Sequence, residues 1–335
     1  MVFLNFFISS SSFFGTLHRN FIFFMKNVLV DRKNCIACGN CTHVCSEVFS
    51  IQDGASLPDN TQMREDLVSA VDTAIRQCPV QVISWEGDAN RSEAAPSTGG
   101  IFSFFSRLFG SEGKEMKSDT LVFLDSKDLT SSVSVFTFQS PHIAFIPGQY
   151  LTIKLSDAEG DFWRAYSIFS GDAETISFCI RLSDTGRGAR FLREKLQKGV
   201  QIPFKGPKGE FLLRSTPKEK IFVVTGTGVS PVFSMLKSLS PQVPARLYFG
   251  LLNEDDIFLK KELEAFPNLN ITFALSDAKT DAFFKGRVTD IIRDGDWNEN
   301  QEFYLCGNPH MIDDARKLLM EKGIPNENVV FEHFS

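Results

Sequence analysis

The sequence has no surplus of basic residues, no long apolar run and no even number of cysteines. It has 35 Lys and Arg against 41 Asp and Glu, a net charge of −6, and no long basic stretch, so we expect no nucleic-acid partner. Its seven cysteines are an odd number crowded toward the N-terminus, which does not fit the disulfide framework of a secreted protein. We therefore expect a reducing, cytoplasmic compartment.

The first 24 residues are rich in Phe and Ser, but their apolar runs are too short to span a bilayer. A signal peptide would begin with basic residues and end in a small-residue cleavage site, and neither is present. Met25 opens an ordinary cytoplasmic start. We interpret residues 1–24 as a non-native or disordered leader, with a hydrophobic anchor as the alternative.

The first motif that carries chemistry is CIACGNCTHVC, residues 35–45. A tight C-x2-C-x2-C loop presents three thiolates to a cubane cluster and turns backbone N–H groups toward its sulfides, which points to Cys35, Cys38 and Cys41. In two-cluster proteins the next cysteine, here Cys45, serves a second cluster, but this chain has no second triplet. Cys78 instead follows a stretch of helical periodicity that can return it to the loop.

Residues 26–88 resemble the single-cluster bacterial ferredoxins, because the triplet, a helix, Cys78-Pro79 and a final strand, VISWE, follow in that order. The resemblance implies an α+β ferredoxin-like domain over residues 25–88, with a 4Fe-4S cluster on Cys35, Cys38, Cys41 and Cys78. Cys45 is then a spare, buried thiol. A three-iron cluster and a structural zinc ion are the alternatives, although zinc favours separated C-x2-C pairs.

Residues 89–118 are rich in Ser, Gly and Ala and predict a linker. Inside it, residues 101–109 place Ile101, Phe104, Phe105, Leu108 and Phe109 on one face of a short helix. We expect this helix to dock on the chain's own domains. Weak peripheral contact with a membrane is the alternative, but such a helix would carry more basic residues.

Residues 119–216 contain strand-like runs between turn residues, which favours a small antiparallel β-barrel. The segments FIPGQYLTI, RAYSIFS, DTGRGARFL and GPKGEF resemble, in order and spacing, the flavin domain of the ferredoxin-NADP reductase superfamily. The resemblance implies bound FAD, with Arg164 at a phosphate, Tyr166 on the isoalloxazine, Ser167 near its N5, and Gly186 and Gly188 at the pyrophosphate. Arginine suits phosphate and an aromatic face suits a flat ring.

Residues 217–335 alternate strand, turn and helix, which predicts an α/β doubly wound, five-strand nucleotide-binding domain. Its first turn, TGTGVS, contributes Gly226, Thr227 and Gly228 to nucleotide binding. We expect the next helix to begin with Ser230 as N-cap and Pro231 at its first position, which makes a phosphate site.

The segments LCGNPHM and VVFEHF extend the resemblance to the reductase superfamily through residue 335. It implies that Cys306 faces the nicotinamide, that Glu332 and Ser167 join it in the active site, and that Phe334 lies on the flavin. Ordinary core packing is the alternative for Cys306 and for Phe334.

The choice of nucleotide is predicted from Ser276 and Asp277, which stand where NADPH-specific relatives commonly have Ser-Arg. A carboxylate repels the 2′-phosphate but accepts hydrogen bonds from a ribose diol, so the pair favours NADH over NADPH. Lys279 and Lys285 lie near enough in sequence to support phosphate binding instead, and Asp277 capping the following turn is a further alternative.

Together these features predict a multi-domain oxidoreductase that passes electrons from NAD(P)H through FAD to a fused iron–sulfur cluster and on to a redox partner protein. The alternatives are the reductase component of an oxygenase, and an electron-delivery or redox-sensing subunit without NAD(P)H turnover of its own. The sequence leaves the acceptor and the direction of electron flow open, because cluster potentials span a wide range.

Overall fold

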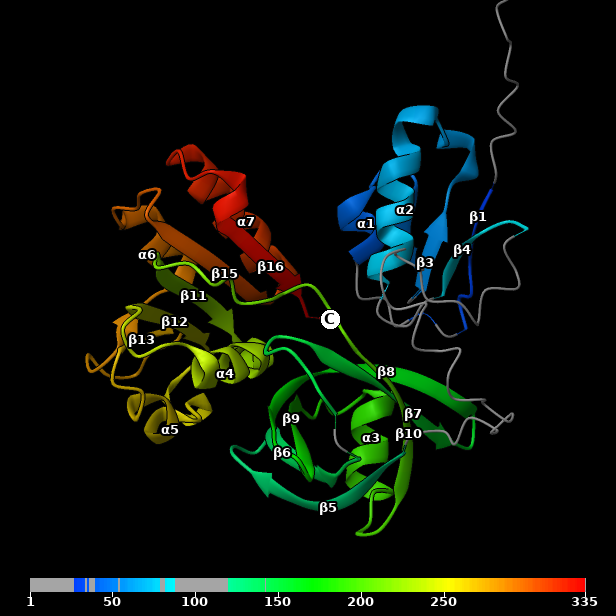
Figure 1. Cartoon of the computed structure of the whole chain (residues 1–335), viewed down its shortest axis with the longest axis horizontal. Helices are drawn as coiled ribbons and strands as arrows, with labels where there is room; N and C mark the ends of the chain where they lie inside the picture. Colours follow the sequence, from blue (N-terminus) through cyan, green and yellow to red (C-terminus); the bar gives the residue numbers. More distant parts are fainter. Residues whose placement is uncertain are drawn as a thin grey trace, which may run out of the picture.

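The computed structural model of the chain describes residues 27–33, 35, 40–53, 55–78, 82–87, 120–141 and 143–334. These residues form three successive groups of elements, shown in blue to cyan, green, and yellow to red in Figure 1. The predicted leader, the linker with its helix at 101–109, and Cys38 lie outside the described residues.

The N-terminal domain, residues 27–87, packs two short antiparallel strand pairs against two helices. Its elements are β1 (Val28–Val30) paired with β4 (Ile83–Trp85), α1 (Asn40–Val44), β2 (Phe49–Gln52) paired with β3 (Ala55–Pro58), the 3-10 turns Asn60–Gln62 and Glu65–Leu67, and α2 (Val68–Gln77). Helix α2 buries Val71 and Ala74 on one face, so the helical spacing carries Cys78 to the same core.

The barrel domain, residues 120–212, is a closed six-strand barrel with the strand order β10-β5-β6-β9-β8-β7. Its elements are β5 (Thr120–Asp128), β6 (Val133–Gln139), β7 (Tyr150–Asp157), β8 (Gly160–Gly171), β9 (Thr175–Arg181), α3 (Arg187–Glu194) and β10 (Gln201–Lys208). Alternate residues of each strand point inward, and Leu151, Ile153 and Leu155 of β7 are fully buried in this way. The predicted antiparallel barrel is confirmed.

The sheet domain, residues 219–334, is a parallel sheet with the order β14-β13-β12-β11-β15-β16. Its strands are β11 (Glu219–Thr225), β12 (Ala245–Leu251), β13 (Leu269–Leu275), β14 (Phe284–Lys285), β15 (Gln301–Gly307) and β16 (Val329–His333). Its helices are α4 (Val229–Ser238), α5 (Lys260–Glu264), α6 (Val288–Asp294) and α7 (Pro309–Glu321), with 3-10 turns at Gly226–Gly228, Glu254–Asp256 and Asn326–Asn328. The expected five strands are present, and the two-residue β14 adds a sixth at one edge.

The sheet is covered on both faces, as a doubly wound fold requires. Phe222 and Val224 of β11 pack with α4 and α5, while the alternate residues Ile221 and Val223 pack with α6 and α7. A strand buried on both sides explains the continuous apolar run IFVV in the sequence.

The barrel and the sheet share one apolar core. Phe169 of β8 stacks on Phe233 of α4, with ring centroids 4.4 Å apart and planes 17° apart. Close by, the Lys237 ammonium donates to Ser170 Oγ over 2.7 Å. These contacts fix the end of β8 against α4, which is where a cavity opens between the two domains.

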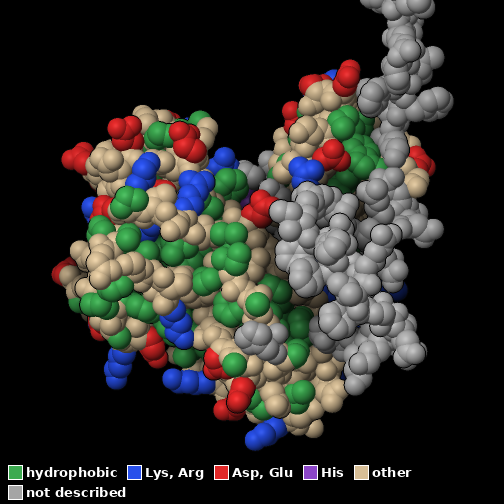
Figure 2. All heavy atoms as spheres, in the orientation of Figure 1, with side chains coloured by type: hydrophobic (Ala, Val, Ile, Leu, Met, Phe, Trp, Pro, Cys, Tyr) green, Lys and Arg blue, Asp and Glu red, His purple; other side chains and the backbone are tan. Residues whose placement is uncertain are grey.

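In the described ranges, no helix has both the length and the apolar character needed to cross a membrane. Acidic and basic side chains are interspersed over the face of the sheet and barrel domains that Figure 2 shows.

Candidate active site and cluster site

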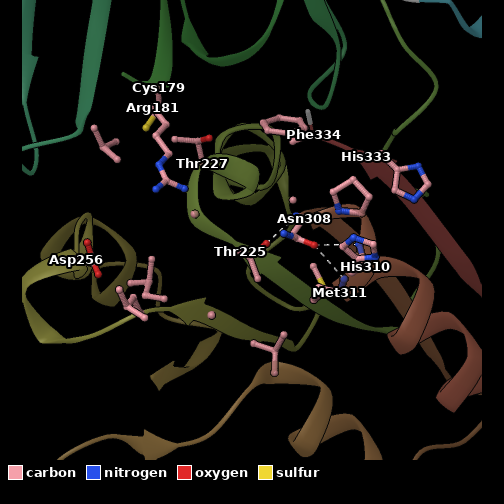
Figure 3. A pocket seen from close by; sticks show the side chains of 18 of the residues that line it. Cys179, Arg181, Thr225, Thr227, Asp256, Asn308, His310, Met311, His333 and Phe334 are labelled. Atoms are coloured by element: carbon pink, nitrogen blue, oxygen red, sulfur yellow. Dashed lines mark hydrogen bonds between the residues drawn. The ribbon is translucent and has the colours of Figure 1, made fainter. Parts of the chain in front are cut away.

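A cavity of about 950 Å³ lies between the barrel and the carboxyl ends of the sheet strands. The barrel contributes β8 and β9, the sheet domain contributes the turns after β11, β12 and β15, and the chain ends on its wall (Figure 3). The predicted site residues on this wall are Tyr166, Ser167, Gly226, Thr227, Ser276, Glu332 and Phe334. The cavity is large enough to hold two flat ring systems together.

Tyr166 and Ser167 form the barrel side of the cavity. Burial raises the pKa of Tyr166 to about 12, so its hydroxyl stays protonated and its ring faces the cavity as a neutral aromatic surface. The Ser167 backbone carbonyl accepts a hydrogen bond from Ser230 Oγ over 3.2 Å. Ser230 therefore ties the predicted flavin strand to the first helix of the sheet domain.

Arg164 and Gly188 lie next to Tyr166. A methyl group added at Gly188 would sit 3.1 Å from Tyr166 Oη and 3.4 Å from Arg164 Cγ, so glycine leaves room that another residue would fill. The guanidinium of Arg164 donates to the Trp163 carbonyl over 2.8 Å, and burial lowers its pKa without removing its charge. A half-buried cation beside a glycine cradle fits the phosphate role predicted for Arg164.

The segment DTGRGARFL forms the start of α3. Gly186 is the residue before the helix, no side chain caps it, and its N–H donates to Ser183 Oγ over 3.0 Å. Arg187 is held elsewhere, because it forms a two-point contact with Asp157 and packs 4.0 Å from the Phe162 ring centroid. That contact lowers the pKa of Asp157 to about 2.

The side of the cavity predicted to bind the nicotinamide is formed by tightly packed turns of the sheet domain. A methyl group on Gly228 would lie 2.3 Å from the Cys306 carbonyl oxygen, and Gly307 has φ +130° with Thr225 against it. The Asn308 N–H donates to Thr225 Oγ1 over 2.8 Å, and the Asn308 side chain caps α7 by accepting from the His310 N–H over 2.9 Å (Figure 3). The glycines of TGTG and LCGN thus let β11 and β15 end side by side.

One helix start differs from the prediction. Helix α4 begins at Val229 after a 3-10 turn, with Gly228 as its N-cap, so Ser230 and Pro231 lie inside the first turn. The reason is that the Ser230 hydroxyl donates to the barrel, as described above, and does not cap its own helix.

Cys306 and Glu332 are cross-strand neighbours on β15 and β16. Cys306 is fully buried and is not on the cavity wall, and burial raises the pKa of its thiol well above the ordinary value. Glu332 does line the cavity, and its Oε2 atom is buried and has no hydrogen-bond partner among the residues that the structure describes. Burial raises the pKa of Glu332 to about 8, so the carboxyl is largely protonated at neutral pH.

Phe334 also lies on the cavity wall, close to the end of the chain (Figure 3). Its backbone N–H donates to the Gly307 carbonyl over 2.9 Å, and its ring packs against the core shared by the barrel and the sheet. The same aromatic ring therefore borders both the flavin strand and the turn after β15.

Ser276 and Asp277 follow β13. Ser276 lines the cavity, whereas Asp277 is exposed and lies beside it. The turn that follows is capped by Glu254, which accepts from the Lys279 N–H and the Thr280 N–H over 2.9 Å each. Asp277 is thus not the residue that caps this turn.

Three of the four predicted cluster ligands are described. The Cys35 sulfur accepts from the Ser56 N–H over 3.3 Å, the Cys41 thiol donates to Ser56 Oγ over 3.2 Å, and the Cys78 sulfur accepts from the Val82 N–H over 3.4 Å. Backbone N–H groups directed at cysteine sulfurs are the arrangement that stabilises cluster thiolates.

Burial is the main cause that raises the pKa of the Cys41 thiol, and the charge of Cys35 raises it further. Cys35 therefore lies near Cys41. Among the described residues, no three Cys, His, Asp or Glu side chains are grouped closely enough to hold a metal ion. Cys38 lies outside these residues. Cys45 packs in the apolar core of the domain with Val48, Phe49 and Val71, and so do Cys41 and Cys78, so the spare role of Cys45 stays a prediction.

Several cavity residues were missed by the sequence analysis. Arg181 of β9 extends into the cavity toward the turn after β11 (Figure 3), and Arg287, Asp256 and Asn40 also line it. They belong to segments far apart in the chain and carry no shared motif. The one sequence feature that could have indicated a site role was the position of Arg181 shortly before the segment DTGRG.

Comparison with known domain families decides what the three parts are. Residues 30–85 match the 4Fe-4S single cluster domain of Ferredoxin I, residues 121–212 match the oxidoreductase FAD-binding domain, and residues 222–317 match the oxidoreductase NAD-binding domain. The chain joins a single-cluster ferredoxin domain to FAD-binding and NAD-binding oxidoreductase domains. The predicted fold class and the predicted cofactors, FAD, a 4Fe-4S cluster and a nicotinamide nucleotide, are confirmed by these matches.

The ferredoxin–oxidoreductase chain is similar to electron-transfer proteins of bacteria. It is 30% identical over 216 residues to the toluate 1,2-dioxygenase electron transfer component of Pseudomonas putida, covering 62% of this chain and 63% of that one. It is 33% identical over 159 residues to methane monooxygenase component C of Methylosinus trichosporium, covering 44% and 46%. The chain therefore spans less than two thirds of the length of these relatives.

Solved structures show the same fold for the FAD and NAD domains. A ferredoxin NADP+ reductase from Neisseria gonorrhoeae with bound FAD and NADP superposes with a TM-score of 0.57 at 21% identity, over 64% of this chain and 97% of that one. The ferredoxin reductase in carbazole 1,9a-dioxygenase superposes with a TM-score of 0.58 at 21% identity, over 65% and 69%.

Proposed function

We propose that the protein oxidises NADH and delivers the electrons through FAD and its own iron–sulfur cluster to an acceptor protein. The observation that carries this proposal is the shared cavity, where Tyr166 and Ser167 of the FAD domain face the turn of Gly226 and Thr227 in the NAD domain. A flavin and a nicotinamide placed on these two walls would meet ring to ring.

Bound FAD would supply the conversion of a two-electron hydride donor into one-electron transfers, with one proton released for each hydride. The chain's own residues place the groups for this. In our proposal Arg164 and the start of α3 at Gly186 hold the phosphates, and Gly188 leaves space for them beside Tyr166. The Tyr166 ring then orients the isoalloxazine, and Phe334 keeps water from its other side.

Glu332 and Cys306 are proposed to serve the hydride step. Glu332 carries a proton on a buried carboxyl at the cavity wall, which can donate a hydrogen bond to the nicotinamide amide or the flavin. Cys306 lies behind Glu332 on the neighbouring strand. Its buried thiol stays neutral and supports the cavity wall from behind.

The acceptor is proposed to be an oxygenase in the cytoplasm. The names of the relatives describe electron-transfer components of a dioxygenase and a monooxygenase system, and the odd number of cysteines favours a reducing compartment. The competing function is an electron-delivery subunit without NADH turnover of its own.

The test is anaerobic mixing of the purified protein with NADH. We expect the flavin absorbance to bleach first and the cluster absorbance to fall after it, and we expect turnover with an artificial electron acceptor. Cys306→Ala and Glu332→Ala should keep their FAD but bleach more slowly, Glu332→Ala by about a hundredfold, which is the lower end of a typical acid–base contribution. A wild-type flavin that neither NADH nor NADPH reduces would leave only the delivery subunit.

A further inference from the structure

The ferredoxin domain reaches the flavin cavity through the segment that carries a cluster ligand. Asn40 is the first residue of α1 and precedes Cys41, and it lines the cavity together with Tyr150, Tyr166 and Ser167. The chain that holds the cluster therefore forms part of the same wall as the predicted flavin-binding residues.

A second contact places the other ligand segment on the same side of the barrel. Lys208 ends β10, and the Cys78 thiol is close enough to act electrostatically on its ammonium. Burial and the neighbouring Lys205 lower the pKa of Lys208, and Cys78 acts in the opposite direction. Lys208 forms no ion pair with any carboxylate in the described ranges, and Cys78 is an acidic group near enough to act on its charge.

The residues between these contacts form a row across three strands. Lys208 is the cross-strand partner of Tyr150 on β7, and Tyr150 is the cross-strand partner of Ser167 on β8. Two strand spacings separate the backbones of Lys208 and Ser167, which is about 10 Å. One buried tyrosine thus lies between the lysine that faces Cys78 and the serine predicted at the flavin ring.

Figure 1 shows the ferredoxin elements beside the β7, β8 and β10 edge of the barrel, while Figure 2 shows an open notch between them and the NAD domain. Lys205 lies on the same edge, with its ammonium 4.5 Å from the Trp163 ring centroid. Lys205 and Lys208 therefore place positive charge on the edge of the barrel that the ferredoxin domain meets.

We propose that this edge of the barrel is the docking surface for the cluster end of the ferredoxin domain, and that Lys208 is the residue that positions it. Cluster thiolates bring negative charge to the surface, and a half-buried lysine without a carboxylate partner complements that charge. Docking there sets the cluster one tyrosine away from the flavin cavity, and Lys208 stabilises the reduced cluster. The inference rests on the proposed function, since it gives the route by which FAD would reach the cluster.

The test uses the full-length protein with both cofactors and compares Lys208→Glu, Lys208→Met and Lys208→Arg with wild type. Lys198→Glu is the matched control, because Lys198 is an exposed lysine of the same domain that is not on the cavity wall. Two quantities are measured: the rate of cluster reduction after the flavin has bleached, and the cluster potential in an EPR-monitored titration with a chemical reductant.

We expect Lys208→Glu to slow cluster reduction about tenfold, which corresponds to one ordinary charge contact. The rate of cluster reduction in Lys208→Met should lie between the rates of Lys208→Glu and wild type. The rates in Lys208→Arg and Lys198→Glu should match the wild-type rate. The cluster potential should fall in the same order, while iron content, FAD content and the rate of flavin bleaching stay unchanged.

Equal transfer rates and equal potentials in wild type and Lys208→Glu would overturn the docking surface. If Lys208→Glu loses its cluster, Lys208→Met carries the same comparison. Failure of NADH to reduce the flavin would refute the proposed function separately, because the potential titration needs no nucleotide and still tests Lys208.

Discussion

Glu332 shows how a single residue couples the active site to pH. Its pKa is about 8 in the folded chain against an ordinary value of 4.5, because burial disfavours the charged form. Between these two values the folded state keeps a proton that the unfolded state has released. Its contribution to stability is therefore complete below pH 4.5 and is lost as the pH rises to about 8.

We predict that Glu332→Gln lessens the loss of stability between pH 6 and pH 8 in nucleotide-free protein. The wild-type slope from this one proton is at most about 1.4 kcal/mol per pH unit, and solvent at the cavity wall reduces it. Urea unfolding at the two pH values measures it, with the exposed Glu327→Gln as control. Equal pH slopes in Glu332→Gln and wild type would show that the carboxyl is ionised in the folded state.

The cysteines of the ferredoxin domain are predicted to differ in role although Cys41, Cys45 and Cys78 share one buried cluster, which leads to a second prediction at this scale. Cys78→Ala should abolish the cluster because it removes a predicted ligand. Cys45→Ala should keep the cluster and cost about 1 kcal/mol of stability, since it only trims a buried side chain. Iron content and visible absorbance distinguish the two, and an equal loss of iron in both variants would refute the single-cluster ligand set.

At the scale of the element, the turn after β13 bears on the choice of nucleotide. Both lysines that could have held a 2′-phosphate are paired, Lys279 with Asp255 at 2.9 Å and Lys285 with Asp281 at 2.5 Å. Asp277 remains exposed beside the cavity. The local charge therefore still favours a ribose diol over a phosphate.

We predict that kcat/KM favours NADH, and that Asp277→Arg shifts the ratio toward NADPH by about tenfold, or about 1.4 kcal/mol. Asp296→Arg is the matched control, because Asp296 is an exposed carboxylate that does not line the cavity. Steady-state kinetics with both nucleotides decide it. A wild-type preference for NADPH would contradict the argument and would direct attention to Arg287 on the cavity wall.

The elements also show what could be predicted from the sequence. Turns such as TGTG and LCGN were predictable because Gly226 and Gly307, which follow strand ends, have φ values of +52° and +130° that glycine adopts readily. The start of α4 was not, because Ser230 bonds to the Ser167 carbonyl, 63 residues away. The contact of Arg187 with Asp157 and the electrostatic effect of Cys78 on Lys208 could not be predicted for the same reason: no local pattern encodes a partner on another strand or in another domain.

At the scale of the whole molecule, the cavity exists only because the FAD and NAD domains are held at one angle. Stacking of Phe169 on Phe233, the Lys237 to Ser170 hydrogen bond and the Ser230 to Ser167 hydrogen bond join the last residues of β8 to positions along the length of α4. Because β8 and α4 belong to the two domains that form the cavity walls, weakening the contacts between them should change the distance between the two bound nucleotides. It should affect the folding of either domain less.

Phe233→Ala tests this. Removing a buried ring from the shared core should cost about 3 kcal/mol, at the lower end for Phe→Ala because the site is at a domain boundary. We expect the variant to keep its FAD, since no predicted FAD-binding residue is changed, but to bleach with NADH at least tenfold more slowly as the rings lose their alignment. Lys237→Ala, which removes an exposed hydrogen bond to Ser170 and a 5.6 Å cation–π contact but leaves the stacked rings in place, should change the rate much less. Phe233→Ala protein that bleaches at the wild-type rate would mean that bound nucleotides, and not the stacked phenylalanines, hold the domains in register.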